Sequence, residues 1–204
     1  MSGADPSAAD LAALVASRIC HDLVNPLGAV AAGLELLEAS GPQGGGEERA
    51  LVAESLAGAL ARLRLLRIAF GQAAPGATLA RREIAEALGG VYGRGRLAVV
   101  WQPLAERARS EVRLALLGLL CLETALPRGG QVTIGDATGA AAGWRLVAEG
   151  PRLHAEGRHW ESLASGPEAA TAREVPFSLF AAAAAAIGRR PRLERGAERL
   201  VLLC

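Results

Sequence analysis

The feature that most restricts the fold is an apolar repeat in the first forty residues. Apolar side chains recur in steps of three and four from Ser7 to Ala39, at Leu11, Leu14, Val15, Ile19, Leu23, Leu27, Val30, Leu34 and Leu37. This spacing places them on one face of an α-helix. Asp5-Pro6-Ser7 before the repeat and Ser40-Gly41-Pro42 after it are residue types that begin and end helices. The repeat predicts one long amphipathic helix.

A second apolar repeat follows a glycine-rich connector, Ser40 to Gly46. It runs through Leu51, Val52, Leu56, Leu60, Leu63, Leu66 and Phe70. Two long helices joined by a short loop form an antiparallel hairpin. Both apolar stripes are wider than one hairpin can bury, so we predict that two chains pair into a homodimeric four-helix bundle.

The chain changes character after residue 70. Gly71 to Thr78 is rich in Gly, Ala and Pro, as linkers are, and six of the seven aromatic residues lie beyond it. We therefore place a domain boundary near residue 75. The predicted domains are residues 1–75, the helical hairpin, and residues 76–204.

The second predicted domain mixes short strands with helices. We expect helices over Leu79–Leu88, Ser110–Leu126 and about Pro176–Ile187, and a strand over Arg96–Gln102. Two β-hairpins are predicted to pair Gln131–Ile134 with Trp144–Val147 and Arg190–Arg195 with Arg199–Leu203, with Gly150–Glu174 irregular. Helices against a mainly antiparallel sheet form an α/β sandwich, so the fold class of the whole chain is α+β.

Composition excludes several classes of function. The 22 basic residues balance 21 acidic ones to a formal charge of +1, which argues against binding to nucleic acid. All 22 are Arg, which removes a P-loop and lysine-based catalysis. Cys20, Cys121 and Cys204 lack metal-ligand spacing and indicate free thiols in a reducing compartment. With no signal-peptide pattern and no uncharged 18-residue span, we expect a cytoplasmic protein with no membrane partner.

The chain has three histidines, and only one has a setting that indicates chemistry. His154 and His159 lie five residues apart in a polar segment without a ligand partner, so we predict loop residues without function. His21 points away from the apolar stripe of the first helix and should be exposed on a polar ridge. A surface histidine without a role is the competing interpretation.

The residues around His21 favour a functional site. Those beside it on the helix are Ser17, Arg18, Asp22, Asn25 and Gly28. Arginine pairs well with a phosphoryl group, and glycine leaves the helix surface bare for a docking partner. Pro26 removes a helical hydrogen bond to Asp22 at a cost of ~3 kcal/mol and should kink or loosen this turn. Such a cost beside a polar cluster indicates a site.

The segment from Arg18 to Leu27, RICHDLVNPL, resembles the H-box of dimeric sensor histidine kinases, H-[DE]-L-x-[NT]-P-L, which carries the phosphorylated histidine. The longer stretch SRICHDLVNPLGAVAAGLELL, with the order of elements over almost the whole chain, resembles the ChpT-type histidine phosphotransferases. That family relays phosphate from a hybrid kinase to response regulators in bacterial cell-cycle control. Its second domain is a degenerate form of the ATP-binding (Bergerat) domain of histidine kinases.

The nucleotide motifs of histidine kinases are missing from the second predicted domain. Leu117 and Cys121 stand where the two N-box asparagines would be, and Ala148 stands where the D-x-G aspartate would be. Arg173 to Pro176 lacks the G-x-G of the lid. Magnesium prefers hard oxygen ligands, which Leu and Cys do not supply. We therefore expect no ATP, no other cofactor and no metal of the protein's own.

The resemblance implies a mechanism. His21 accepts a phosphoryl group from a receiver-domain aspartate of a hybrid histidine kinase and passes it to response-regulator receiver domains, each of which brings its own Mg²⁺. Arg18 would stabilise the added charge, Asp22 would orient the ring or a neighbour, and Asn25 would support phosphatase action. The predicted docking surface consists of Ser17 and Gly28 on the first helix and Arg62, Leu66 and Phe70 on the second. A solvated face is the other interpretation of Arg62 and the arginines near it.

Two other functions stay open, and so does the question of whether the protein is an enzyme in its own right. An ATP-dependent sensor histidine kinase core would be labelled by ATP alone. In a non-catalytic dimerisation or scaffold module, His21→Gln would leave every activity intact.

Overall fold

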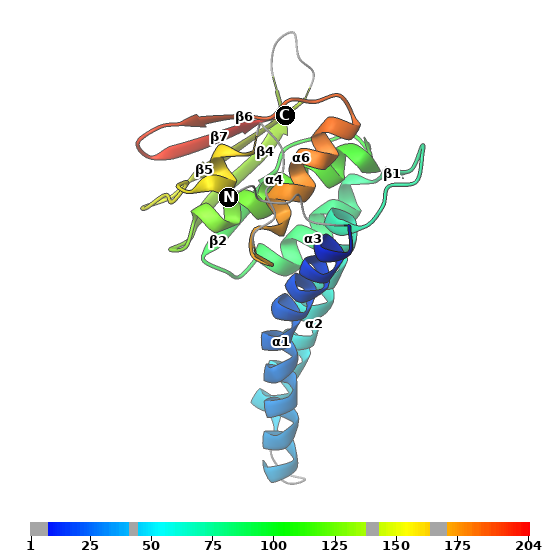
Figure 1. Ribbon diagram of the computed structural model, residues 1–204. Coiled ribbons are helices and arrows are strands. Elements are labelled where there is room, and N and C mark those ends of the chain that lie inside the picture. The colour runs from blue at the N-terminus through cyan, green and yellow to red at the C-terminus, as the bar shows by residue number, and fades with distance from the viewer. Residues whose placement is uncertain (1–7, 41–44, 138–142, 164–170) are drawn as a thin grey trace.

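The computed structural model describes residues 8–40, 45–137, 143–163 and 171–204, which form a long helical hairpin that carries an α/β sandwich at one end (Figure 1). Helix α1 spans Ala8–Ser40 and α2 spans Gly46–Phe70, so both predicted helices are confirmed. Helix α1 continues through Pro26 without a break. The predicted connector lies mostly outside the described residues.

The two hairpin helices pack closely at a glycine. A Cβ atom on Gly33 would lie 2.5 Å from Cγ2 of Val52, so a larger residue here would force the Val52 side chain to move. Packing within one hairpin leaves many large apolar side chains 44% to 63% exposed, at Val24, Leu27, Leu34, Leu36, Leu51, Leu56, Leu60 and Leu63. The predicted homodimer would cover these side chains, and it stays a prediction.

The sandwich is built on a five-stranded sheet of order β2-β4-β5-β7-β6. Its strands are β2 (Leu97–Trp101), β4 (Gly130–Asp136), β5 (Trp144–Glu149), β6 (Arg192–Arg195) and β7 (Arg199–Leu203). Strands β2 and β4 are parallel, and the other pairs are antiparallel. Both predicted β-hairpins are confirmed, with Ile134 opposite Leu146 and Leu193 opposite Leu202.

Helices α4 (Arg109–Ala125) and α6 (Val175–Ala186) cover one face of this sheet (Figure 1). The core lies where they meet it: a Cβ on Gly118 of α4 would be 3.1 Å from Leu146, 3.2 Å from Phe180 and 3.3 Å from Leu202. The short strands β1 (Thr78–Leu79) and β3 (Arg107–Ala108) form a separate pair, and α5 (Arg158–Glu161) is one turn in the segment predicted as irregular. The α+β fold class is confirmed.

The third helix differs from its prediction. Helix α3 spans Arg81–Tyr92, so it begins after Leu79 and passes through Gly89 and Gly90, where we expected it to stop. The reason is a helix crossing: a Cβ on Gly90 would lie 2.5 Å from Cβ of Ala61 on α2. The glycine therefore serves close packing of α3 against α2, and the longer helix brings Tyr92 to the hairpin.

The core of the sandwich extends onto the hairpin. Leu65, Leu66, Ile68 and Ala69 of α2 are buried in the same cluster as the residues of α3 and α4. A turn at Ala74–Ala77 lies in the predicted linker. The boundary near residue 75 nevertheless stays a prediction, because the hairpin and the sandwich share packing.

All three tryptophans lie in the sandwich. The rings of Trp101 and Trp144 are 5.1 Å apart, and Trp160 packs edge-on to Phe177 at 4.8 Å. Each tryptophan is at most 8% exposed.

Within the described residues, no helix is both long enough and apolar enough to cross a bilayer.

Candidate functional site

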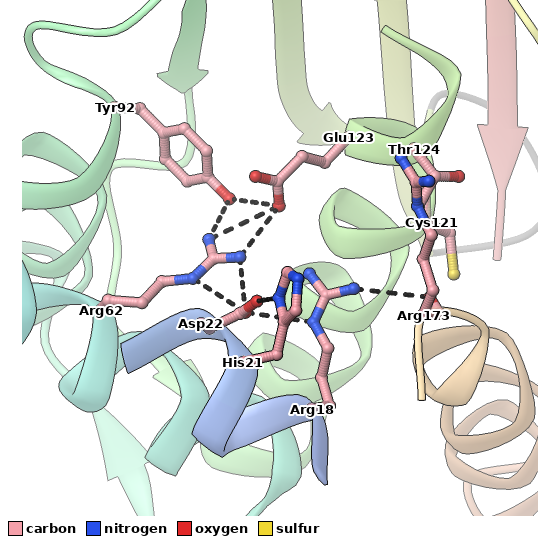
Figure 2. A network of polar contacts seen from close by, with 9 residues as sticks. All are labelled: Arg18, His21, Asp22, Arg62, Tyr92, Cys121, Glu123, Thr124 and Arg173. Carbon is pink, nitrogen blue, oxygen red and sulfur yellow. Dashed lines mark hydrogen bonds and ion pairs between the residues drawn. The ribbon is translucent and has the colours of Figure 1, made fainter. Parts of the chain in front are cut away.

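His21 lies on α1 where the hairpin adjoins the sandwich, beside Asp22 and Arg18 (Figure 2). Its side chain is 80% exposed. The prediction of an exposed ridge is confirmed for this residue. Its Nδ1 atom lies 3.3 Å from Oδ1 of Asp22. Ser17, Asn25 and Gly28 are also exposed, as expected. The ring is thus held at one nitrogen and accessible at the other.

Asp22 is the buried centre of the site, with a side chain only 6% exposed. Its Oδ2 accepts hydrogen bonds from Nε of Arg18 at 3.1 Å and from Nε and Nη2 of Arg62 at 3.1 and 2.8 Å. Burial by itself raises the pKa of the Asp22 carboxyl. The positive charges of Arg62 and Arg18 outweigh burial and hold the pKa below its ordinary value of 3.8. Asp22 is therefore an anchored carboxylate whose second oxygen faces His21.

Arg62 connects this carboxylate to the sandwich (Figure 2). Its Nη1 lies 3.4 Å from the Tyr92 hydroxyl, and Nη1 and Nη2 each lie 3.5 Å from Oε2 of Glu123. The Tyr92 hydroxyl donates to the same Oε2 at 3.2 Å. Burial lowers the pKa of Arg62, but Glu123, Tyr92 and Asp22 together raise it above its ordinary range. The Arg62 guanidinium therefore has Asp22 along one edge and Tyr92 and Glu123 along the other.

The residues predicted for docking on the second helix are placed differently. Leu66 is 1% exposed, so its prediction as a surface residue is wrong. Phe70 is partly buried against the core, and the Arg62 side chain is only 13% exposed. The cause is the packing of α2 on α3 and α4 of the same chain.

Arg18 also departs from its expected place. Its side chain is 11% exposed, and besides Asp22 it donates from Nη1 to the backbone carbonyl of Arg173 at 3.5 Å. It is therefore already bonded, and it is not the free cation beside His21 that we expected. Its contact with Arg173 ties α1 to the segment before α6.

His21 stands at the rim of two hollows. The larger, of about 590 Å³, lies between the hairpin and the sandwich and is lined by Ser17, Arg18, Asp22, Arg62, Glu123, Thr124, Thr171, Ala172 and Arg173. The smaller, of about 310 Å³, lies on its other side and is lined by Asp22, Asn25, Pro26, Gly58, Arg62, Gly90 and Val91. A partner that reaches His21 can therefore contact both parts of the chain.

Sequence reasoning missed Tyr92, Glu123 and Arg173. The available signal was Glu123, an acidic residue in the otherwise apolar run LALLGLLCLETAL. A carboxylate there needs a partner, because unpaired charges are rarely buried. Nothing in the sequence identified Arg62 as that partner, since the two lie 61 residues apart.

The residues that the sequence resemblance aligns with the kinase N-box and D-x-G positions lie in the core. Leu117, Cys121 and Ala148 are all 0% exposed. Among the described residues, no group of three or more His, Cys, Asp and Glu side chains could hold a metal ion. His159 pairs with Glu174 at 3.2 Å and packs on Phe177 at 4.7 Å, and the His154 backbone N–H donates to the Ala125 carbonyl. The predictions that the protein binds no cofactor and that these histidines lack function stay predictions.

The structure joins a helical hairpin to an α/β sandwich, and the hairpin carries an exposed histidine beside a buried carboxylate. This combination defines a protein of the histidine phosphotransfer class. The model of the family described as histidine phosphotransferase C-terminal domain matches residues 81–199, which is more than half of the chain. The protein belongs to that family.

Two known proteins support this assignment and the predicted ChpT-type resemblance. Protein phosphotransferase ChpT of Brucella abortus (strain 2308) is 39% identical over 132 residues, which are 63% of this chain and 61% of the relative. The aligned region thus spans less than two thirds of the relative's length. A solved structure described as a bacterial phosphotransferase covers 100% of this chain and 99% of its own, at 29% identity and a TM-score of 0.80.

Proposed function

We propose that the protein is a phosphorelay intermediate that carries a phosphoryl group on His21. The observation that carries the proposal is the pairing of an 80% exposed imidazole with a buried carboxylate on its Nδ1. A hydrogen bond from Nδ1–H to Asp22 Oδ1 selects the tautomer in which Nε2 holds the free lone pair. Nε2 is then the nucleophile.

In the proposed step, Nε2 of neutral His21 attacks the phosphorus of a receiver's aspartyl phosphate in line. The N–P bond forms as the P–O bond breaks, and the electron pair leaves on the receiver's carboxylate. Nδ1 keeps its proton, so the positive charge created on the ring faces the Asp22 carboxylate. Transfer to a second receiver reverses these bond changes. Most of the catalysis is positioning and electrostatics.

The roles of the arginines follow from their contacts. Arg18 and Arg62 both donate to Oδ2 of Asp22, which leaves Oδ1 for His21. They act on the ring through Asp22. Asn25 is exposed on the same helix and lines the smaller hollow, where it can position water for slow hydrolysis of a docked receiver's phosphate.

The proposed partners are the receiver domain of a hybrid histidine kinase and the receiver domains of response regulators. Each would bring its own Mg²⁺ and dock over His21, Ser17 and Gly28. A second copy of the chain would cover the exposed apolar side chains of the hairpin. ATP is not part of the proposal, because Leu117, Cys121 and Ala148, which the resemblance aligns with the kinase ligand positions, are buried in the core. We expect the protein to act in the cytoplasm.

The test is to mix the protein with a radiolabelled, aspartyl-phosphorylated receiver domain from a hybrid kinase and to follow the label. We expect transfer to the wild type and none to His21→Gln, and we expect no label from ATP and Mg²⁺ alone. His154→Gln is the matched control and should accept label as the wild type does. Labelling by ATP would favour the kinase alternative, and undiminished label on His21→Gln would refute the assignment of His21.

A further inference from the structure

We propose that Tyr92 and Glu123 of the sandwich are positioning residues for His21, acting through Arg62 and Asp22. The proposal rests on the function proposed above and deepens it. The four groups come from four helices, since Glu123 lies on α4, Tyr92 on α3, Arg62 on α2 and Asp22 on α1 (Figure 2).

Arg62 connects Asp22 to the sandwich, and its side chain must be held in one rotamer to do so. It supplies two of the three hydrogen bonds that Oδ2 of Asp22 accepts, at 3.1 and 2.8 Å. An arginine side chain has many rotamers, and holding one of them costs ~2 kcal/mol of conformational entropy. The Tyr92 hydroxyl and the Glu123 carboxylate contact the far edge of the guanidinium at 3.4 to 3.5 Å. They restrict Arg62 to the rotamer that reaches Asp22.

Tyr92 and Glu123 also restrict each other. The hydroxyl donates to Oε2 of Glu123 at 3.2 Å, and the tyrosine is only 7% exposed. Because the ring is packed, the hydroxyl has a fixed position, and it fixes one oxygen of a carboxylate that is itself 30% exposed. The rigid end of the network is therefore in the sandwich and the exposed end is His21.

Formal charge gives Glu123 a second role. Two arginines, Arg18 and Arg62, face two carboxylates, Asp22 and Glu123, so the network is neutral. Without Glu123 the buried network carries one excess positive charge. Arg62 would then turn outward toward water or toward any anion in the larger hollow, and Asp22 would keep only Arg18.

The expected consequence concerns rate rather than docking. An Asp22 carboxylate that is free to rotate no longer selects the Nδ1–H tautomer, so a fraction of His21 carries its proton on Nε2. That tautomer cannot attack phosphorus through Nε2. For Tyr92, partner affinity should change little, because Tyr92 is buried and lines neither hollow, whereas Glu123 lines the larger one.

The test uses the full chain with Glu123→Gln and Tyr92→Phe, and with Glu86→Gln as the matched control. Glu86 is a half-exposed glutamate on α3 that pairs with Arg82. Single-turnover transfer from a phosphorylated receiver domain is measured over a range of receiver concentrations. We expect the maximal rate to fall about tenfold for Glu123→Gln and about threefold for Tyr92→Phe, with the half-saturating concentration unchanged for Tyr92→Phe. Glu86→Gln should match the wild type.

A double-mutant cycle separates positioning from general damage. If Glu123 acts through Asp22, Glu123→Gln should change the rate less than about twofold in an Asp22→Asn background. The ¹⁵N NMR signals of the His21 ring should show a dominant Nδ1–H tautomer in the wild type and a mixture in both variants. Thermal unfolding checks that the variants are folded, and if Glu123→Gln does not fold, Tyr92→Phe carries the test.

Three results would overturn the inference: wild-type rates and tautomer in both variants, an equal loss in both backgrounds, or a change confined to the half-saturating concentration. Failure of the wild type to take phosphate would instead refute the proposed function. The tautomer measurement would still decide the role of Glu123 and Tyr92 in that case.

Discussion

Two nitrogens of Arg62, Nε and Nη2, converge on a single oxygen of Asp22 at 3.1 and 2.8 Å. Both side chains are at least 87% buried, and they join the two helices of the hairpin beside His21. Charge-assisted hydrogen bonds of this kind are stronger than neutral ones and tolerate little displacement. The pair therefore sets the register of α1 against α2 at the site.

Asp22 should make the stability of the protein depend on pH in the acid range. Its pKa in the folded protein is below the ordinary value of 3.8, so its ionised form stabilises the fold at pH values above 3.8. That contribution is lost as the pH falls through the folded-state pKa. We expect the free energy of unfolding in urea to be about 2 kcal/mol higher for the wild type than for Asp22→Asn between pH 5 and 8. The gap should narrow below pH 3.8, and a gap that widens on acidification would contradict this assignment.

Gly90 and Gly89 should respond in opposite directions to alanine. A Cβ on Gly90 would lie 2.5 Å from Cβ of Ala61, whereas a Cβ on Gly89 would meet nothing within 4 Å. We expect Gly90→Ala to lower the free energy of unfolding by about 1–3 kcal/mol through overpacking. Gly89→Ala should raise it by about 0.5–1 kcal/mol, because alanine favours helix. Chemical denaturation of both variants measures the difference, and equal effects would refute the close crossing.

The three thiols should differ sharply in reactivity. Cys20 is exposed, whereas Cys121 and Cys204 are buried. Burial raises the pKa of Cys121 well above 9.0 and that of Cys204 to about 12, so little thiolate forms at either. With a disulfide reagent at pH 8 we expect one thiol per chain to react at once and two only after denaturation. Cys20→Ser should remove the fast phase, and fast reaction of a second thiol would show that the core opens.

Self-association should depend on the hairpin. Leu34 and Leu56 are 49% and 44% exposed on α1 and α2. A charge at a buried apolar contact is costly, so we expect Leu34→Asp and Leu56→Asp to convert a dimer to monomers in sedimentation experiments. Leu104→Asp is the control, since Leu104 is 81% exposed in the sandwich. A wild type that sediments as a monomer would refute the predicted bundle.

Local patterns predicted most of the fold. The limits of both hairpin helices, the pairing of both β-hairpins and the exposure of His21 follow from periodicity and turn residues within a few positions. Each of these patterns lies within a single helix, strand or turn. They can therefore be recognised without knowing how the rest of the chain packs.

The errors arose where one pattern has two physical explanations. An apolar stripe shows that a helix face is covered, but it does not show which element covers it. We assigned the Leu66 face to a partner, and the structure covers it with α3 and α4. A glycine pair equally ends a helix or permits a close crossing, and at Gly90 the crossing is what the structure has.

The contacts of Arg62 with Tyr92 and Glu123 could not be predicted from the sequence for a different reason. Tyr92 and Glu123 lie 30 and 61 residues from Arg62, and no periodicity relates them. Their contact exists only because α3 runs on to Tyr92 and α4 packs across α2. A single sequence carries no signal for such a long-range polar contact.

The confinement of all three tryptophans to the sandwich gives the molecule a built-in optical asymmetry. Tryptophan fluorescence, excited selectively over Tyr92, reports on Trp101, Trp144 and Trp160, whereas far-ultraviolet circular dichroism is dominated by helices, of which α1 and α2 are the longest. Coincident melting curves would show that hairpin and sandwich unfold as one cooperative unit, as their shared core implies. Loss of the circular dichroism signal at temperatures where the tryptophan fluorescence is unchanged would show that the hairpin unfolds while the sandwich stays folded.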